Sequence, residues 1–239
     1  MIIGGLQKLS LLDYPSQVAT IVFTQGCNFR CQFCYNPMLV LPPSRTNIKQ
    51  TAPSSISEDE LFIFLKKRLG KLDAVVITGG EPTIHQDLPE FIAKIKALGY
   101  LVKLDTNGTN PKMLAELLSK KLLNYIAMDI KAPLVKYALI SGVEADLSKI
   151  KKSVKIIMDS GLPYEFRTTV VPALLDQDDI AKMAEELEGA KLWYLQKFEA
   201  NKDLINQKLM GQISYSDKEM KQLAQTASRL AGNCLYRQY

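Results

Sequence analysis

The chain has 239 residues, of which 47% are hydrophobic and 23% charged, and its formal net charge is +5 at pH 7. This composition is typical of a globular protein with a sizeable core. Charged residues interrupt every apolar run before the roughly 18 residues that a membrane span needs. No basic leader with a cleavage site opens the sequence, and the basic residues are spread along the chain. We therefore expect a cytoplasmic protein that binds neither membrane nor nucleic acid.

Short β-branched runs alternate with longer amphipathic segments. The short runs predict six strands, at 18–25, 73–80, 101–108, 124–131, 163–172 and 191–198. The amphipathic segments predict helices at 57–71, 87–99, 111–121, 147–161, 176–189 and about 216–231. Such alternation favours an α/β fold of mostly parallel strands. Six βα units are too few for a closed eight-stranded barrel, so we expect a partial (β/α)6, TIM-like barrel in one domain spanning 1–239.

A loop at about 25–56 interrupts this alternation. Three of the four cysteines, Cys27, Cys31 and Cys34, lie within its first ten positions, and 36–56 is rich in Pro, Ser and Thr. Loops of this length are usually functional or mobile. A chain of this size does not need disulfides for stability, so we interpret the three clustered cysteines as reduced metal ligands.

Polar residues follow the ends of successive predicted strands. Gly79–Pro82 follow the second strand, Asp105–Asn107 end the third, Asp129 and Lys131 end the fourth, and Arg167 lies within the fifth. Because ligands of such folds gather at the carboxyl ends of parallel strands, these residues are candidates for one site.

Two kinds of metal site fit the cysteines. A structural zinc site needs four protein ligands, and Cys234 would have to supply the fourth. An iron–sulfur cluster held by three thiolates would instead leave one iron open for a small-molecule ligand. The spacing C-x3-C-x2-C favours the second interpretation, and we expect Cys234 and Trp193 to serve packing.

The cysteine motif, with Phe33 before its last thiol, resembles the signature of radical S-adenosylmethionine enzymes. The sequence GGEP at 79–82 is similar to the GGE motif of the same family. Longer stretches resemble the anaerobic ribonucleotide reductase activating proteins, which are similar to pyruvate formate-lyase activating enzymes; they are 5–37, 75–83, 101–111, 125–133 and 164–172. One departure is Tyr35, where that subfamily often has His; it would flank the cluster and affect its potential.

The resemblance implies a radical SAM type of barrel with a role for each candidate residue. Cys27, Cys31 and Cys34 would bind a [4Fe–4S] cluster, whose open iron takes the amino and carboxylate groups of S-adenosylmethionine. Gly79, Gly80, Glu81 and Pro82 would hold the methionine amino group. Asp105, Thr106 and Asp129 would surround a monovalent cation, and Lys131 and Arg167 would face the cofactor's carboxylate or hydroxyls. Asn107 is the last of the predicted cofactor-binding residues. From the residues alone, Asp105 and Asn107 could also form an Asx turn that caps the next helix.

The implied activity is reductive cleavage of S-adenosylmethionine to a 5′-deoxyadenosyl radical, which generates a glycyl radical on a partner enzyme. The expected partner is anaerobic ribonucleoside-triphosphate reductase, and the expected electron donor is a flavodoxin or ferredoxin. No side chain resembles a catalytic nucleophile or base, in agreement with chemistry carried by cofactors. Alternatives are another glycyl-radical enzyme such as pyruvate formate-lyase, a small molecule or peptide as substrate, and a zinc-bound interaction module.

Overall fold

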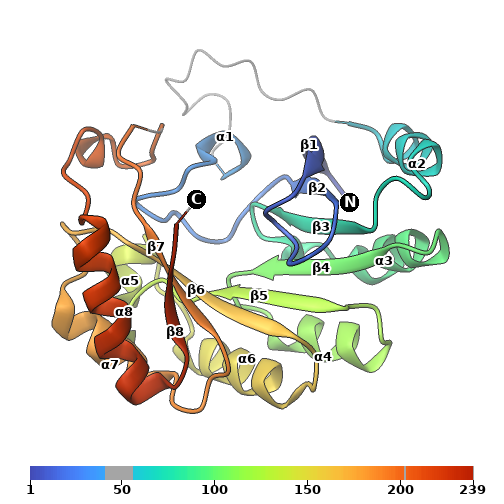
Figure 1. Ribbon diagram of the computed structural model, residues 1–239. Helices are drawn as coiled ribbons and strands as arrows, with labels where there is room; N and C mark the ends of the chain where they lie inside the picture. The colour runs from blue at the N-terminus through green and yellow to red at the C-terminus, as the bar shows by residue number, and fades with distance from the viewer. Residues whose placement is uncertain (41–55, 202, 239) are drawn as a thin grey trace. The chain divides into compact units, whose positions relative to one another are not determined.

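The computed structural model describes residues 1–40, 56–201 and 203–238 (Figure 1). Most of the predicted cluster loop beyond Val40 lies outside the described residues. The strands follow one another through the sheet in chain order: β1 (Ile3–Ser10), β2 (Ala19–Thr24), β3 (Ala74–Gly79), β4 (Leu101–Thr106), β5 (Tyr125–Asp129), β6 (Tyr164–Val170), β7 (Trp193–Lys197) and β8 (Cys234–Arg237).

Helices separate most of these strands. They are α1 (Pro37–Val40), α2 (Glu58–Lys67), α3 (Leu88–Ala97), α4 (Pro111–Ser119), α5 (Tyr137–Ser141), α6 (Leu147–Asp159), α7 (Gln177–Glu186) and α8 (Asp217–Ala231). The described residues also contain short 3-10 helices, η2 (Pro82–Ile84), η3 (Leu134–Lys136) and η4 (Gln207–Leu209). No helix in the described part of the chain is both long enough and apolar enough to span a bilayer.

The predicted α/β class with mostly parallel strands is confirmed, and the six predicted strands correspond to β2–β7. The predicted strand number is wrong, because β1 and β8 flank this set. β1 pairs antiparallel with β2, and β8 pairs parallel with β7. β1 contains a Gly–Gly pair and consecutive exposed polar residues, and β8 has only 4 residues. Neither carries the alternation that identifies a strand from sequence.

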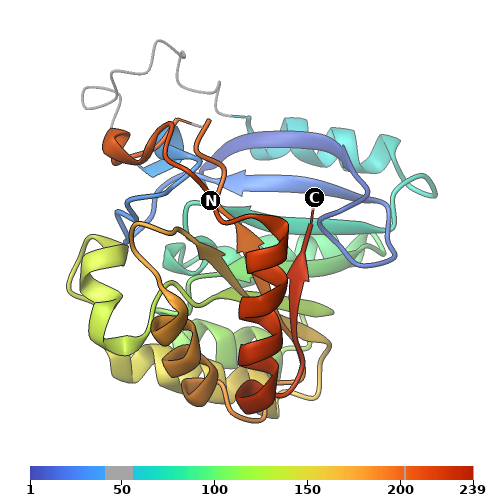
Figure 2. The same ribbon diagram turned by 60° about the vertical axis from the view of Figure 1, so that its left-hand side comes forward.

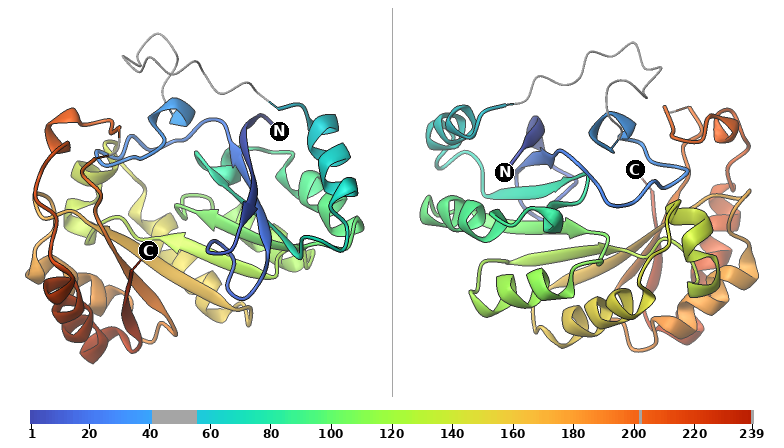
Figure 3. Two further views of the ribbon diagram at one scale, coloured as in Figure 1. Left: turned by 45° about the horizontal axis from the view of Figure 1, so that its top comes forward. Right: turned by 180° about the vertical axis from the view of Figure 1, so that it is seen from behind.

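The chain forms two compact units, and the division falls within β5. The first unit comprises 1–28, 36–106 and 110–126. In it, β2 pairs parallel with β3 from Ala19↔Ala74 to Thr24↔Gly79, and β3 pairs parallel with β4. Figure 3 shows the antiparallel β1 and β2 beside each other. The helices α2 and α3 also lie side by side, with the rings of Phe62 and Phe91 5.9 Å apart.

The second unit comprises 29–35, 107–109 and 127–239. Its strands β6, β7 and β8 are parallel, and Arg167 is in register with Tyr194. The long helix α8 packs along β8 (Figure 2). Cys234 and Trp193 are both buried here, as expected for packing residues, and burial raises the pKa of Cys234 to about 12. The single domain expected from the sequence stays a prediction.

Candidate functional site

The cysteine-bearing segment follows the carboxyl end of β2. Cys27 belongs to the first unit, whereas Cys31 and Cys34 belong to the second, and none of the three forms a disulfide within the described residues. A turn joins the last two, because the backbone N–H of Cys34 donates to the carbonyl of Cys31 at 3.1 Å. Burial raises the pKa of the Cys31 thiol to about 11, although the nearby Lys131 ammonium opposes that shift.

Backbone hydrogen bonds hold residues 29–35 in the second unit. The N–H of Arg30 donates to the carbonyl of Ser141 at 2.7 Å, and that of Gln32 donates to Ile140 at 3.3 Å. From a different element, the N–H of Asn206 donates to the carbonyl of Gln32 at 2.9 Å. The conformation around Cys31 is therefore fixed by the protein's own backbone.

Tyr35, the departure noted in the sequence, anchors the end of this segment. Its ring stacks on Phe198 at 6.4 Å between centroids, and its hydroxyl oxygen accepts a hydrogen bond from the backbone N–H of Glu199 at 2.8 Å. Burial raises the pKa of Tyr35 to about 12. A histidine ring could not make the same phenolic contact, so Tyr35 contributes to the local packing of this chain.

The two glycines at the end of β3, Gly79 and Gly80, allow the backbone to approach the residue before Cys27. The N–H of Glu81 donates to the carbonyl of Gly26 at 2.8 Å, and a Cβ at Gly80 would lie only 1.8 Å from that oxygen. Gly79 has φ of 112°, and a Cβ there would meet the backbone of Thr24 at 2.4 Å. The backbone contacts thus explain the residue type at both positions.

Glu81 is buried, with 1% of its surface exposed. Its Oε1 accepts hydrogen bonds from the N–H of Thr83 at 3.1 Å and from the hydroxyls of Thr83 at 2.5 Å and Thr106 at 2.7 Å. Pro82 begins η2, and Glu81 caps it. The structure therefore brings Glu81 and Thr106 together in the first unit, and donors hold the carboxylate in one orientation.

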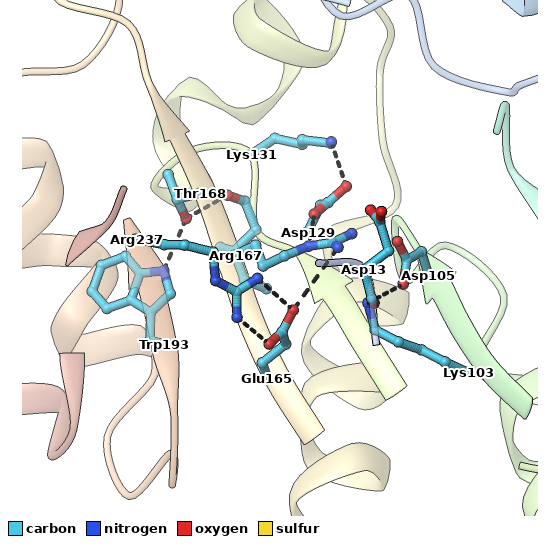
Figure 4. A network of polar contacts seen from close by, with 11 residues as sticks. Asp13, Lys103, Asp105, Asp129, Lys131, Glu165, Arg167, Thr168, Trp193 and Arg237 are labelled. Atoms are coloured by element: carbon cyan, nitrogen blue, oxygen red, sulfur yellow. Dashed lines mark hydrogen bonds and ion pairs between the residues drawn. The ribbon is translucent and has the colours of Figure 1, made fainter. Parts of the chain in front are cut away.

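Asp105 has a buried counter-ion, Lys103, which is not among the residues predicted for the site. Lys103, which is 2% exposed, lies with its Nζ 3.0 Å from Asp105 Oδ1, and also donates to the carbonyl of Asp13 at 2.6 Å (Figure 4). A sequence signal exists, because residues two apart on a strand point to the same face. Any cation beside Asp105 would have to compete with this ammonium.

Asn107 forms the Asx turn that was the alternative interpretation of this segment. Its Oδ1 accepts from the N–H of Thr109 at 3.1 Å and from the Thr109 hydroxyl at 2.7 Å. The helix that follows is capped by a different residue from those named in that interpretation. Asn110 caps α4, because its side chain accepts from the N–H of Met113 at 3.2 Å. Asn107 is therefore engaged in shaping the turn after β4.

Asp129, Lys131 and Arg167 form a cluster in the second unit (Figure 4). Lys131 Nζ donates to Asp129 Oδ2 at 3.0 Å, and Arg167 Nε donates to Asp129 Oδ1 at 2.9 Å. Burial alone would raise the pKa of Asp129, but the charges of Arg167 and Lys131 outweigh it and lower that pKa to about 2. Lys131 also lies 5.9 Å from the ring centroid of Phe33, within the cysteine segment. The three charges sum to +1, which suits an anionic group.

Glu165 and Arg237 support this cluster, and neither is among the residues predicted for the site. Glu165 is 1% exposed and receives Nη1 of Arg237 at 3.0 Å and Nη2 at 2.5 Å, while Arg167 Nη1 lies 3.9 Å away (Figure 4). Arg237 lies with its guanidinium carbon 3.6 Å from the ring centroid of Tyr194. Glu165 and Arg167 share a face of β6, but Arg237, the partner of Glu165 on β8, is 72 positions from Glu165. No local pattern could have identified it.

Two further hydrogen bonds link β7 to the backbone of this cluster. Nε1 of Trp193 donates to the hydroxyl oxygen of Thr168 at 3.0 Å, and that hydroxyl donates to the carbonyl of Ile130 at 2.8 Å (Figure 4). Ile130 lies between Asp129 and Lys131 in the sequence, and Thr168 follows Arg167. This chain therefore connects the backbone that carries the charged residues with the buried indole on β7.

Within the described residues, no three Cys, His, Asp or Glu side chains lie close enough together to enclose a metal ion. The structure does provide two observations that fit a cluster with a small-molecule ligand. They are the backbone approach at Gly80, and the cationic pair Lys131 and Arg167 in the same unit as Cys31 and Cys34.

Comparisons with known proteins agree on the class of this chain. The model of the radical SAM superfamily matches residues 21–187. A Methanocaldococcus jannaschii protein, provisionally named a glycyl-radical enzyme activating enzyme, is 32% identical over 99% of this chain and 95% of its own length. The pyruvate formate-lyase-activating enzyme of Streptococcus mutans is 27% identical over 83% of this chain and 75% of its own. The crystal structure of Streptococcus suis SuiB bound to S-adenosylmethionine has a TM-score of 0.63 at 16% identity, covering 91% of this chain and 52% of that one.

Proposed function

We infer that this chain, which belongs to the radical S-adenosylmethionine (radical SAM) superfamily, is an enzyme that activates a partner protein by generating a glycyl radical on it. Membership of the superfamily implies a [4Fe–4S] cluster and S-adenosylmethionine as cofactors. The observation that carries the inference is the similarity to a glycyl-radical enzyme activating enzyme over 99% of this chain and 95% of the relative. When bound, the cofactors supply a 5′-deoxyadenosyl radical that removes a hydrogen atom from the partner's glycine.

Different residues of this chain would bind the cluster and the methionine ammonium of S-adenosylmethionine. Cys27, Cys31 and Cys34 would hold the cluster. Gly79 and Gly80 bring the backbone close, and the oriented carboxylate of Glu81 would accept from the methionine ammonium. Pro82 fixes the start of the 3-10 helix that Glu81 caps.

The charged cluster of the second unit would hold the anionic end of the cofactor. Lys131 and Arg167 both donate to Asp129, so one positive charge remains for a carboxylate or for ribose hydroxyls. Their pairing with Asp129 keeps both cations ordered, because an unpaired buried charge would be costly.

A monovalent cation beside Asp105, Thr106 and Asp129 remains part of the proposal. Hard oxygen ligands suit such an ion, but Lys103 already supplies Asp105 with a positive charge at 3.0 Å. The engagement of Asn107 in its Asx turn favours a role in shaping the backbone over direct contact with the cofactor.

We propose anaerobic ribonucleoside-triphosphate reductase as the partner and a flavodoxin or ferredoxin as the electron donor. The support is the resemblance of five segments of this chain, beginning with residues 5–37, to the activating proteins of that reductase. The similarity to a pyruvate formate-lyase-activating enzyme makes pyruvate formate-lyase the second candidate.

Anaerobic reconstitution with iron, sulfide, S-adenosylmethionine, a reductant and each candidate partner tests the proposal. The expected result is release of 5′-deoxyadenosine together with a glycyl-radical doublet in the electron paramagnetic resonance spectrum of one partner. Replacing Cys31 by Ala should abolish both signals. Cys234→Ala is the matched control, because Cys234 is also a buried thiol. This variant should leave both signals intact.

The outcomes separate this proposal from its alternatives. Deoxyadenosine without the doublet, with turnover of a small molecule or peptide, would replace the activating role by another radical SAM reaction. A colourless protein that holds one zinc ion, and loses it in Cys234→Ala, would make the chain a zinc-bound interaction module instead.

A further inference from the structure

His85, the only histidine of the chain, ends the short 3-10 helix η2 and contacts the backbone just before Cys27. The ring atom Nε2 of His85 lies 3.0 Å from the carbonyl oxygen of Gln25. Because a carbonyl oxygen only accepts, Nε2 must carry the proton and donate it. The side chain of His85 therefore forms a hydrogen bond with the residue two positions before the first thiol.

The backbone of Gln25 and Gly26 lies beyond the paired part of β2, so its polar groups need partners outside the β2–β3 ladder. The helix η2 supplies a donor from each of its ends. At its start, the N–H of Glu81 donates to the carbonyl of Gly26 at 2.8 Å. At its end, His85 donates to the carbonyl of Gln25. The loop that begins with the Gly79–Pro82 motif thus holds both carbonyls that precede Cys27.

Backbone groups satisfy the remaining N–H donors of these two residues. The N–H of Gln25 donates to the carbonyl of Ile2 at 3.0 Å, and that of Gly26 donates to the carbonyl of Leu39 on α1 at 2.8 Å. The side-chain amide of Gln25 also donates to the carbonyl of Leu39, at 3.1 Å. Substitution cannot remove the backbone partners, but it can remove the His85 side chain. All of these residues belong to the first unit.

We propose that His85 is a positioning residue that fixes Cys27 relative to Glu81 by donating to the carbonyl of Gln25. The inference rests on the proposed function, in which Cys27 binds the cluster and Glu81 accepts from the methionine ammonium. S-adenosylmethionine would then be held by the open iron and by Glu81 together, so its affinity depends on how well the two are placed. His85 acts through Gln25 and is not itself a ligand.

His85→Gln and His85→Asn form a matched pair of variants. Both replace the imidazole by a neutral amide that can donate. The amide nitrogen of Gln lies as many bonds from the backbone as Nε2 of His, so His85→Gln can restore the hydrogen bond to Gln25. The amide nitrogen of Asn is one bond closer to the backbone and does not reach that carbonyl.

Equilibrium dialysis of S-adenosylmethionine against the reconstituted protein gives the first measurement. His85→Asn should bind about fivefold more weakly than the wild type, the equivalent of one hydrogen bond of about 1 kcal/mol, and His85→Gln should bind nearly as well as the wild type. Alkylation of the apo-protein by iodoacetamide, mapped by mass spectrometry, gives the second. Cys27 should react faster in His85→Asn than in His85→Gln, whereas Cys34, in the second unit, should react at one rate in both.

Tyr100→Phe is the control for a general loss of stability. The hydroxyl of Tyr100 also donates to a backbone carbonyl of the first unit, that of Leu65 at 2.7 Å, but this bond joins α2 to the residue before β4. The variant should unfold at a lower urea concentration than the wild type. Its affinity for S-adenosylmethionine and its alkylation of Cys27 should equal those of the wild type.

Equal affinities and equal Cys27 alkylation in His85→Asn and His85→Gln would overturn the role of His85 and leave the proposed function standing. An equal rise in the alkylation of Cys27 and Cys34 would also overturn it, because the whole chain would then be loosened. A wild-type chain that takes up no iron–sulfur cluster would overturn the proposed function itself. Alkylation of the apo-protein would still decide whether His85 holds Cys27.

Discussion

Arg237 affects the position of Arg167, because both guanidinium groups lie near the same carboxylate, that of Glu165. Glu165 is enclosed between two guanidinium groups, and the two-pronged contact with Arg237 satisfies both of its oxygens. Arg167 is then able to direct its Nε to Asp129 at 2.9 Å while its Nη1 stays 3.9 Å from Glu165. Without Arg237, the buried carboxylate would attract Arg167 away from Asp129.

We predict that Arg237→Ala lowers the free energy of unfolding by about 3 kcal/mol, because it leaves a buried carboxylate without its main partner. It should also weaken binding of S-adenosylmethionine to the reconstituted protein, measured by equilibrium dialysis. The control is Lys197→Ala, which removes an exposed ion pair with Asp217 and should cost about 0–1 kcal/mol. Equal losses of stability in the two variants would contradict the assigned role of Arg237.

At the scale of elements, the short helix α5, which has 5 residues, holds the backbone on both sides of Cys31. Its last carbonyls accept the backbone N–H groups on both sides of Cys31, and Gly142 ends it with φ of 71°. A Cβ at Gly142 would lie 2.4 Å from the carbonyl oxygen of Arg30. The glycine therefore permits the contact between this helix and the cysteine segment.

Gly142→Ala should displace the cysteine segment and lower the affinity for iron at least about tenfold, equivalent to about 1.4 kcal/mol. Gly161→Ala is a close control, because Gly161 has φ of 73° but no atom within 4 Å of its added Cβ. Both variants carry the backbone strain of a left-handed residue, so only the contact with Arg30 differs. Iron bound per chain after anaerobic reconstitution measures the effect, and equal iron in both would refute the explanation.

At the scale of the whole molecule, stability should fall in acid. Within the described part of the chain, the following carboxyl groups have a pKa below the ordinary value: Glu60, Asp87, Asp129, Asp146, Asp176, Asp217 and Glu219. Such groups bind protons more tightly in the unfolded chain, so their contribution is present above the unfolded pKa and is lost as the pH falls through the folded pKa. Because the pKa of Asp129 is about 2, its contribution to stability is lost only as the pH falls to about 2.

We predict that Asp129→Asn reduces the loss of apo-protein stability between about pH 4 and pH 2 by on the order of 2 kcal/mol. Denaturant unfolding at a series of pH values measures it. Glu186→Gln is a control of opposite sign, because burial raises the pKa of Glu186 and its charged form costs stability at neutral pH. An unchanged acid slope in Asp129→Asn would show that its ion pairs do not contribute.

Features of the fold and the site can be predicted from the sequence where the residues that form them lie near one another in the chain. The strands β2–β7 are predicted from residues near one another in sequence, and they are confirmed. The capping box of Ser57 and Glu60 at the start of α2 is a signal of the same local kind. The pairing of Lys103 with Asp105 follows from alternation on one strand, once the burial of that strand is known. Arg237 contacts Glu165, which lies far away in the chain, so only the fold identifies this pair.

Trp193 has a practical consequence, since it is the only tryptophan in the chain. Its indole is fully buried and bonded through Thr168 to the backbone between Asp129 and Lys131. Selective excitation of this fluorophore would therefore report on movements of β5 and β6 without any label. Cofactor titrations can thus be followed optically in the native chain, with Thr168→Val as the variant whose emission is uncoupled from those movements.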